Sequence, residues 1–361
     1  GSGYPRSYQI IQILAEAGYR LTFLPLQKPA NIPEISHLLQ LRGAEILYSQ
    51  DTQKIDLKAL LRSRPNYYDI AFISRPHNIR EAMKHLITYA KKISVIYDAE
   101  AIFSLREIKY NDLNGNHLND SDKERLIQNE VSLTKDATIV TTVNESEKDV
   151  FIKYGADSVH VLGYFFEPKP TPASFEERKD ILFVGGILGY PSPNEDAVHY
   201  FVNQIFPLVR QSIECDFYIV GTNNVKDIWN MESSSVHVTG MVEDLTPYYN
   251  RCRLFVVPTR YSAGIPLKMI EAAAYGLPAV VTPLIGEQLG WRENFDILIG
   301  HDPKDFAQKV VEIYSNQEMF NSLRQNALER IREEYNPENF RISVGNILKE
   351  AIDKRNGFTN E

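Results

Sequence analysis

The chain has 361 residues, of which 43% are hydrophobic and 24% are charged, and its formal net charge is -8. This composition is typical of a globular protein, and the length suffices for two domains. No stripe of Lys and Arg of the kind that neutralises phosphates is present, which argues against a nucleic-acid-binding protein. No apolar run approaches the roughly 18 residues that a membrane span needs.

Only two cysteines occur, Cys215 and Cys252, and both lie in segments typical of packed side chains rather than of a disulfide framework. That usage favours a reducing compartment. The first residues also lack the charged-then-apolar order of a signal peptide. We therefore expect a cytoplasmic protein, and peripheral contact with a membrane surface stays open.

Short apolar runs alternate with helical patterns, which indicates parallel sheets joined by crossover helices. The chain opens with a loop over its first six residues and an amphipathic helix at 8–17, where a Rossmann unit normally opens with a strand. Either the sequence begins inside a longer protein or that strand is supplied in another way. Strands are then predicted in the first half at 20–25, 45–49, 69–74, 93–97, 138–143 and 160–164.

Two polar segments interrupt this pattern in the first half. The stretch 108–122 is rich in Asn and Asp, so we expect a mobile surface loop there, before a helix at 123–134. The three prolines in 167–173 favour an extended linker with few hydrogen bonds. This linker is the predicted domain boundary, so that residues 1–166 form the first domain.

The second half repeats the pattern, with a helix at 195–209 and strands at 181–185, 216–221, 236–239, 254–258, 279–282 and 297–299. Closing helices are predicted at 304–316, 317–334 and 339–354, with a break near Asn336-Pro337. We therefore predict a second domain at 174–337, with 338–361 packed on the first domain. Both domains are expected to be Rossmann-like, α/β and doubly wound, with ligands in a cleft beyond the carboxyl ends of their strands.

The stretch 260–271 follows the strand at 254–258 and opens a helix, with Gly264 in the intervening loop. Free backbone N–H groups and the positive end of a helix dipole favour a phosphate at such a position. Lys268 lies in the first helical turn, where the dipole disfavours a cation unless an anion is bound. Glu271 lies one turn later amid apolar residues and needs donors such as ribose hydroxyls. A plain surface ion pair between Lys268 and Glu271 is the alternative.

A second signal is the strand that runs into Gly185 and Gly186 and is followed by Pro193-Asn194 at the start of a helix. Glycines at this position let a ligand approach the backbone closely. The spacing differs from the dinucleotide fingerprint G-x-G-x-x-G, and a purely structural glycine turn explains it equally well.

In the first half, Asp98 and Glu100 follow the strand at 93–97, at the edge of a parallel sheet where ligands bind. They are candidates for contacts with a substrate, although Asp98 could instead cap the next helix. Arg6 and the loop before it, including Gly3, are candidates for the same substrate side or for a solvent-exposed terminus.

Taken together, these segments resemble glycosyltransferase family 4, among the glycosyl transferases group 1. The resemblance rests on the order of Phe183-Val184-Gly185-Gly186, Pro193-Asn194-Glu195-Asp196-Ala197, Ala263-Gly264-Ile265 with Lys268 and Glu271, and Gly276-Leu277-Pro278-Ala279-Val280-Val281-Thr282. In the first half it extends more loosely to Ser2-Gly3-Tyr4-Pro5-Arg6, Tyr97-Asp98-Ala99-Glu100 and Arg106-Glu107. It implies the GT-B fold, a last helix that crosses back to the first domain, and retention of anomeric configuration.

The resemblance also implies roles for individual residues. Arg260 and Lys268 would hold the diphosphate of a uridine or guanosine diphosphate sugar, and Glu271 would bind its ribose. Gly185, Gly186, Ala263, Gly264 and Ile265 would line the donor site. Asp98 and Glu100 would contact the acceptor or the donor sugar, and Gly3 and Arg6 the acceptor, which the resemblance implies is a saccharide or lipid-linked molecule, as in polysaccharide biosynthesis.

One position departs from the family pattern, which often has two glutamates separated by seven residues. Ala263 stands where the first glutamate is expected, and only Glu271 remains. A branch of the family with small residues before the lysine shares this feature. Ala263 leaves open a non-catalytic protein of the same fold as an alternative. A sugar-nucleotide epimerase on the same two-domain fold is the other alternative.

Asp120-Ser121-Asp122 spells the D-x-D motif with which metal-dependent glycosyltransferases of another fold hold a divalent cation. Here it comes directly before a helical stretch, where Asp and Ser are favoured as caps. The eight histidines are scattered without metal-ligand spacing. We therefore expect no catalytic metal and no cofactor, with helix N-termini and basic side chains supplying the positive charge.

Overall fold

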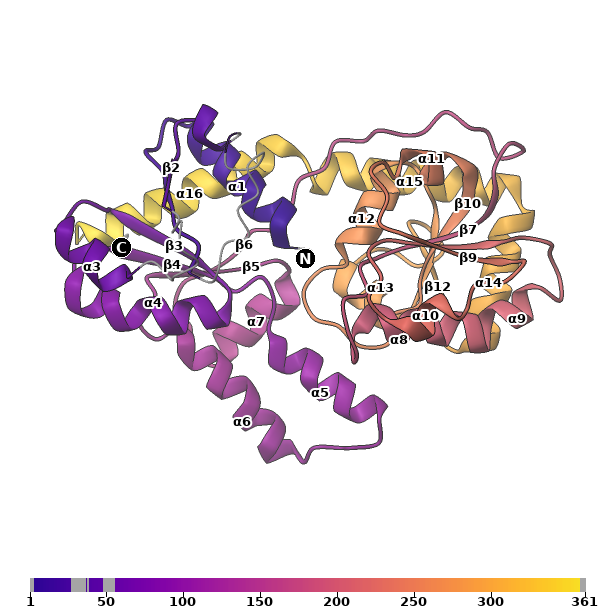
Figure 1. Cartoon of the computed structure of the whole chain (residues 1–361), viewed down its shortest axis with the longest axis horizontal. Helices are drawn as coiled ribbons and strands as arrows, with labels where there is room; N and C mark the ends of the chain where they lie inside the picture. The colour runs from indigo at the N-terminus through magenta and orange to yellow at the C-terminus, as the bar shows by residue number, and fades with distance from the viewer. Residues whose placement is uncertain (1–2, 27–36, 38, 48–55, 358–361) are drawn as a thin grey trace. The chain divides into compact units, whose positions relative to one another are not determined.

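A computed structural model describes residues 3–26, 37, 39–47 and 56–357 (Figure 1). The chain divides into two compact units. Unit 1 comprises residues 1–104, 119–164 and 338–361, and unit 2 comprises residues 105–118 and 165–337. Both units are built on parallel β-sheets, as predicted.

Unit 1 contains a four-stranded parallel sheet and a separate parallel pair of strands. The sheet order is β3-β4-β5-β6, formed by β3 (Ile70–Ser74), β4 (Ser94–Asp98), β5 (Ile139–Thr142) and β6 (Val159–Val161). The pair consists of β1 (Thr22–Phe23) and β2 (Glu45–Ile46). All five residues of β4 are buried, as expected for an inner strand of a sheet that helices cover.

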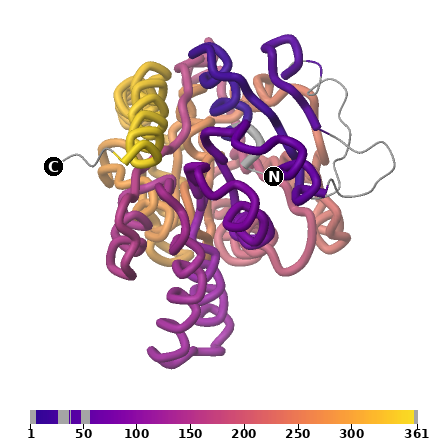
Figure 2. Tube along the Cα trace, turned by 90° about the vertical axis from the view of Figure 1, so that its left-hand side faces the viewer, coloured from indigo at the N-terminus to yellow at the C-terminus, as the bar shows by residue number. Residues whose placement is uncertain are grey.

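The helices that can be given with full bounds in the described first part of the chain are α1 (Gly3–Glu16), α3 (Leu57–Ser63), α4 (Pro76–Tyr89), α5 (Phe103–Leu113), α6 (Asp120–Val131) and α7 (Glu145–Lys153), with a 3-10 turn at Ser132–Thr134. The chain ends in the long helix α16 (Pro337–Arg355), drawn in yellow in Figure 2. This helix is tied into unit 1 because Ser94 Oγ donates to Ala351 O at 2.5 Å and Ser158 Oγ donates to Glu350.

Unit 2 contains a six-stranded sheet in the order β12-β11-β10-β7-β8-β9. Its strands are β7 (Lys179–Val184), β8 (Phe217–Val220), β9 (Val236–Gly240), β10 (Cys252–Val257), β11 (Ala279–Val281) and β12 (Leu298–Ile299). The chain runs outward from β7 through β8 to β9, then returns to β10 and runs the other way. The direction of winding therefore reverses between β7 and β10, as in a doubly wound sheet.

The sheet of unit 2 is covered by helices on both faces (Figure 1). Alternate side chains of β7 enter opposite cores: Phe183 lies in one and Leu182 in the other. One face carries α8 (Pro193–Tyr200), a π-helical turn (Phe201–Ile205), α9 (Phe206–Val209) and α14 (Pro303–Ser315), and the other carries α12 (Leu267–Ala274) and α13 (Pro283–Leu289). The long helix α15 (Gln317–Glu334) contributes side chains to both cores. Unit 2 also contains two shorter helices, α10 (Lys226–Trp229) and α11 (Thr246–Arg251), and the part of α5 that lies within residues 105–118.

Each of the twelve predicted strands overlaps a strand among the described residues. The predicted loop at 108–122 is confined to residues 114–119, so its bounds are wrong: α5 continues to Leu113 and α6 begins at Asp120. The Asn119 side chain accepts a hydrogen bond from the backbone N–H of Asp122 and so caps α6. The Asn and Asp residues of this stretch therefore start a helix instead of forming a long loop.

Two further expectations, for the start of the chain and for the linker at 167–173, are corrected by the structure. The predicted opening loop is helical from Gly3, the first residue of α1, while residues 1 and 2 lie outside the described part. The linker at 167–173 has no regular structure, as expected, but it is not poor in hydrogen bonds. Lys169 N donates to Ala274 O at 2.7 Å and Thr171 N to Tyr275 O at 3.1 Å, which ties the linker to unit 2.

Candidate functional site

The loops after β7 and β10 of unit 2 begin at neighbouring strands, where the winding of the sheet reverses. Ligands of doubly wound sheets bind beyond the carboxyl ends of strands at this point. The loop after β7 carries Gly185 and Gly186, and the loop after β10 carries Arg260 and leads into α12. The topology therefore brings the two sequence signals of the second half to one edge of one sheet.

Lys268 is the second residue of α12, and its ammonium lies in an unusual environment for a lysine. Its Nζ donates to Asn194 Oδ1 and lies 4.3 Å from the centroid of the Phe183 ring. Burial lowers its pKa to about 7. Within the described part of the chain, no carboxylate forms an ion pair with this ammonium. The site thus holds a poorly solvated positive charge beside a helix N-terminus, an arrangement that an anion would stabilise.

Asn194 joins the glycine loop to this lysine. Its Nδ2 donates to Gly186 O at 2.7 Å, while its Oδ1 accepts from Lys268. A Cβ at Gly185 would lie 2.9 Å from both Asn194 Nδ2 and Lys268 Nζ, so only glycine fits there without displacing them. A Cβ at Gly186 would meet nothing within 4 Å, so its backbone is open to approach.

Asn194 belongs to the Pro193-Asn194-Glu195-Asp196-Ala197 motif, but the sequence alone indicates no role for it. Ser192 caps α8 through the N–H of Glu195, and Pro193 follows in the first turn. This start signal could have placed Asn194 near the glycine turn.

Arg260, expected at the diphosphate, is bound by the carboxylate of Asp196, a partner that the sequence alone did not predict. Its Nε donates to Asp196 Oδ2 at 3.0 Å, and its Nη2 donates to the other Asp196 oxygen. The guanidinium lies 4.6 Å from the centroid of the Tyr200 ring. Asp196 and Tyr200 both belong to α8, so this helix orients Arg260 from one side.

Glu271 is half-buried on α12, one turn after Lys268, and burial raises its pKa. Its carboxylate makes no hydrogen bond or ion pair with the residues that the structure describes. The alternative of an ion pair between Lys268 and Glu271 is therefore wrong. A partly desolvated carboxylate without donors is suited to accept two hydrogen bonds from a diol.

The turn before α12 is shaped by Gly264, whose φ of 80° is in the left-handed region that favours glycine. Ala263 is half-buried before it, and Ile265 packs on the same core as α12. The N–H of Leu267 donates to Ile265 O at 2.9 Å. The start of α12, at Pro266, has no side-chain cap, so this helix start lacks the usual side-chain acceptor.

In unit 1, Asp98 and Arg6 form a closed network in which both side chains have 0% exposure. Asp98 accepts from Arg6 and from Ser74 Oγ through Oδ2, and from Thr141 Oγ1 through Oδ1. Arg6 also donates to Leu162 O at 2.6 Å through Nη2. A substrate cannot contact either side chain without exposing it first. In this structure the pair joins α1 to the carboxyl end of β4.

The alternative role of Asp98 as a helix cap is wrong. The carboxylate of Glu130 accepts from the backbone N–H groups of Phe103 and Ser104, at 2.8 and 2.7 Å, and so caps α5. Glu130 lies on α6, 27 positions from Phe103. The cap comes from a different helix, which no local sequence pattern indicates.

Glu100 lies at the carboxyl end of β4 with its side chain 12% exposed. Its Oε2 accepts from Arg75 Nε at 2.9 Å, whereas its Oε1 is buried without a hydrogen-bond partner among the described residues. Burial and the Asp98 carboxylate raise the pKa of Glu100, and Arg75 opposes this rise. Arg75 was missed in the sequence, although Ser74-Arg75-Pro76 places a charged residue at the end of a strand and before a helix.

The remaining sequence candidates concern metals and membranes. Asp120 and Asp122 lie in the first turn of α6. Across the described ranges, no group of three or more His, Cys, Asp or Glu side chains could hold a metal ion. No helix in that part of the chain is both long enough and apolar enough to cross a membrane.

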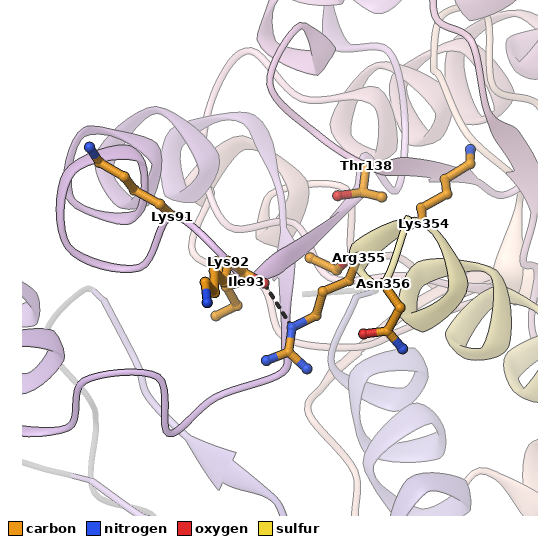
Figure 3. Close-up of a pocket in the computed structure, with 8 residues that line it drawn as sticks. Lys91, Lys92, Ile93, Thr138, Lys354, Arg355 and Asn356 are labelled. Atoms are coloured by element: carbon orange, nitrogen blue, oxygen red, sulfur yellow. Dashed lines mark hydrogen bonds between the residues drawn. The ribbon is translucent and has the colours of Figure 1, made fainter. Parts of the chain in front are cut away.

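A hollow of about 600 Å³ lies at the amino ends of β4 and β5 and at the end of α16 in unit 1 (Figure 3). Lys91, Lys92, Lys354 and Arg355 line it. Arg355 Nε donates to Lys92 O at 2.8 Å, but Figure 3 shows Lys91 and Lys354 pointing away from Arg355. The basic groups therefore do not converge, and this edge of the sheet is opposite to the carboxyl ends where ligands bind.

Comparison with known proteins agrees with this geometry. Residues 178–316, which include the whole candidate site of unit 2, match the family model of glycosyl transferases group 1. No curated protein sequence matches the chain.

Solved structures with the GT-B fold share the architecture at low sequence identity. Anabaena HepE with UDP and glucose is 12% identical, with a TM-score of 0.70 over 96% of this chain and 97% of that one. Sucrose-phosphate synthase from Thermosynechococcus elongatus is 16% identical, with a TM-score of 0.69 over 96% and 92%. TarM is 17% identical, with a TM-score of 0.61 over 78% of this chain, which spans only 54% of TarM. These likenesses confirm the predicted fold.

Proposed function

Because the chain has the GT-B fold and its residues 178–316 match the glycosyl transferases group 1, we propose that it is a glycosyltransferase using a nucleoside diphosphate sugar as donor. The observation that carries the proposal is the pair of side chains on α12. Among the residues that the structure describes, Lys268 is a poorly solvated cation without a carboxylate partner, and Glu271, one turn later, is a carboxylate without a donor. A nucleoside diphosphate supplies both missing partners, with phosphate oxygens for the lysine and ribose hydroxyls for the glutamate.

Catalysis in this proposal consists of stabilising the leaving diphosphate. Negative charge builds on the phosphate oxygens as the bond to the sugar breaks, and fixed positive groups stabilise that charge without reorganising. Lys268 and the N-terminus of α12 supply these groups directly. Arg260 would add a second cation if it exchanges part of its contact with Asp196 for the phosphate. The chemistry then requires no catalytic metal and no cofactor.

We propose a uridine diphosphate sugar as the donor. Anabaena HepE has been solved with UDP-glucose and the pneumococcal transferase GtfA with UDP and GlcNAc, and both share the fold of this chain. The acceptor would be a saccharide or a lipid-linked molecule, and the lipid-linked case includes peripheral contact with a membrane from the cytoplasmic side. Retention of anomeric configuration would follow from attack on the face that the diphosphate leaves, which needs no enzymic nucleophile.

The test has a binding arm and a turnover arm. UDP, GDP, UDP-glucose and GDP-mannose are screened for thermal stabilisation, since a ligand that binds only the folded state raises the unfolding temperature. Release of UDP or GDP from the donor that stabilises best is then measured. Binding with release supports the proposal, and absence of binding by all four nucleotides contradicts it. Binding without release or transfer would identify a non-catalytic protein, the alternative that Ala263 raises.

The role of Lys268 is tested by measuring nucleotide binding to the variant Lys268→Ala, and the matched control is Lys304→Ala. Lys304 is also the second residue of its helix, α14, but it is exposed and its helix is capped by Asp302. Only the Lys268 variant is expected to lose nucleotide binding.

A further inference from the structure

Helix α8 supplies the partners of both cations that are expected at the diphosphate. Asn194 Oδ1 accepts a hydrogen bond from Lys268 Nζ, and the two oxygens of Asp196 accept from Nε and Nη2 of Arg260. Tyr200 follows Asp196 by one turn of α8, and its ring centroid lies 4.6 Å from the same guanidinium. Residues one turn apart share a face of a helix, so a carboxylate and an aromatic ring hold Arg260 from one side.

The two contacts differ in charge. Asn194 is neutral and leaves the charge of Lys268 uncompensated, whereas Asp196 forms an ion pair with Arg260. A carboxylate that binds a guanidinium through both oxygens makes one of the strongest contacts available to arginine. Among the residues that the structure describes, no carboxylate competes with a diphosphate for Lys268. For Arg260, the diphosphate has to compete with Asp196.

The ion pair leaves Arg260 accessible to a ligand. Its side chain is 30% exposed, and that of Asp196 is 16% exposed. The contact uses Nε and Nη2, and Nη1 makes no hydrogen bond with the described part of the chain. A guanidinium has five N–H groups, so a phosphate oxygen can bind Arg260 while Asp196 stays in place. Two anions then lie beside one cation, and they repel each other.

This repulsion depends on the charge of the bound nucleotide. The outer phosphate of UDP-glucose carries about one negative charge, because its second ionisable oxygen is bonded to the sugar. The outer phosphate of UDP carries nearly two at neutral pH, since the second ionisation of a terminal phosphate lies at about pH 6. The charge of Asp196 therefore disfavours the product UDP more than the donor UDP-glucose.

We propose that Asp196 competes with the outer phosphate for Arg260 and thereby promotes release of the nucleoside diphosphate product. Asp196 is a positioning residue in this inference, because it acts on the nucleotide through Arg260. The inference rests on the proposed function, which supplies the donor and the product. It extends that function by assigning the ion pair to one step, the dissociation of the product after transfer.

The variant Asp196→Asn removes the charge and keeps the shape of the side chain. Calorimetry with UDP and with UDP-glucose gives the ratio of the two affinities. We expect the variant to bind UDP-glucose about threefold and UDP about tenfold more tightly, because Coulomb repulsion doubles when the charge of the phosphate doubles. Asp196→Glu keeps the charge and should keep the wild-type ratio. A merely structural role of Asp196 would change both affinities alike and leave the ratio unaltered.

The matched control is Asp227→Asn. Asp227 is exposed in the first turn of α10, which packs against α8, and its carboxylate makes no hydrogen bond or ion pair with the described residues. This variant changes the net charge equally but frees no arginine, so it should keep the wild-type ratio. Displacement of bound radiolabelled UDP then gives its dissociation rate. That rate should fall about tenfold in Asp196→Asn, because affinity differences within one site lie mostly in dissociation.

The reciprocal variant Asn194→Asp gives Lys268 the kind of partner that Arg260 already has. It should weaken UDP more than UDP-glucose, which changes the ratio in the opposite direction, and it decides the question if Asp196→Asn does not fold. An unchanged ratio in Asp196→Asn would overturn the inference. An equally large change of the ratio in Asp227→Asn would also overturn it, because the effect would then not act through Arg260.

Failure of the wild-type protein to bind either nucleotide would instead contradict the proposed function. Inorganic pyrophosphate then replaces the nucleotides in the same comparison, since it carries the same phosphate charges without a base or a sugar. Tighter binding of pyrophosphate by Asp196→Asn, but not by Asp227→Asn, would support the competition for Arg260. Equal binding by wild type and Asp196→Asn, including none by either, would overturn it.

Discussion

Replacing Lys268 with alanine should weaken UDP binding by about ten- to a hundred-and-fifty-fold. A hydrogen bond to a charged group contributes about 1.5–3 kcal/mol, and 1.4 kcal/mol corresponds to a factor of ten in affinity. Two features of the structure set the value within this range. No carboxylate competes with the nucleotide for Lys268 within the described residues, which raises the expected loss. Because the pKa of Lys268 is about 7, this lysine is uncharged in part of the unliganded protein at neutral pH, which slightly lowers the expected loss of affinity.

The same pKa predicts how affinity depends on pH. Phosphate oxygens beside the ammonium favour its charged form, so the pKa of Lys268 rises on binding and UDP binding takes up a proton above pH 7. Affinity should therefore fall as pH rises above about 7, by at most tenfold per pH unit for one proton. In Lys268→Ala this dependence should disappear.

Calorimetry between pH 6 and pH 9 measures both effects, with Lys304→Ala as the matched lysine. Equal UDP affinities for wild type and Lys268→Ala would refute the role of Lys268 at the diphosphate. A wild-type affinity that stays constant from pH 7 to pH 9 would refute the argument from burial even if the alanine variant binds poorly.

Other substitutions test neighbouring parts of the argument. Glu271→Ala should weaken UDP about tenfold or more but hardly change binding of 2′,3′-dideoxy-UDP, which lacks the hydroxyls that Glu271 would accept. Similar losses for both nucleotides would contradict a ribose contact. Gly185→Ala should also weaken UDP, because its Cβ would lie 2.9 Å from Asn194 and Lys268, and a crystal structure would show those side chains displaced. Lys268→Met should raise the unfolding temperature at pH 7. Burial lowers the pKa of Lys268, so the unfolded chain binds the lysine proton more tightly than the folded protein does. The buried lysine therefore destabilises the folded state most below about pH 7, and this destabilisation disappears towards pH 10.5. An unchanged or lower unfolding temperature would show that this lysine is well solvated. Asp120→Ala should leave UDP affinity unchanged with or without Mg²⁺. A loss that depends on Mg²⁺ would show that the Asp120-Ser121-Asp122 motif binds a metal ion.

Local patterns in the sequence predicted most elements of the fold, because they depend on neighbouring residues. Strands such as β7 and β10 are short apolar runs covered on both faces, and their side chains enter two cores in alternation. The start of α12 was readable from Gly264 and Pro266. The prediction of a long loop at 108–122 was wrong in its bounds for a related reason. Helix caps and loops both use Asn and Asp, and local composition does not distinguish the two.

The candidate site was only partly readable. Lys268 and Glu271 lie on one helix, so their relation follows from helical spacing alone. Asn194 joins Lys268 across 74 positions, and Asp196 joins Arg260 across 64. No periodicity links residues at such separations. Similarly, the sequence suggested Asp98 and Glu100 as equivalent candidates, and only their contacts show that one is saturated and the other is not.

By itself, then, the sequence determined the order of strands and helices, the glycine turns and the place where α12 begins, since these depend on backbone preferences within a few residues. The tertiary structure decided which charges are neutralised. It paired Arg6 with Asp98 and Arg260 with Asp196, and it left Lys268 and Glu271 without oppositely charged partners among the described residues. Charge neutralisation acts over a few ångströms in space, and only packing brings distant parts of the chain that close.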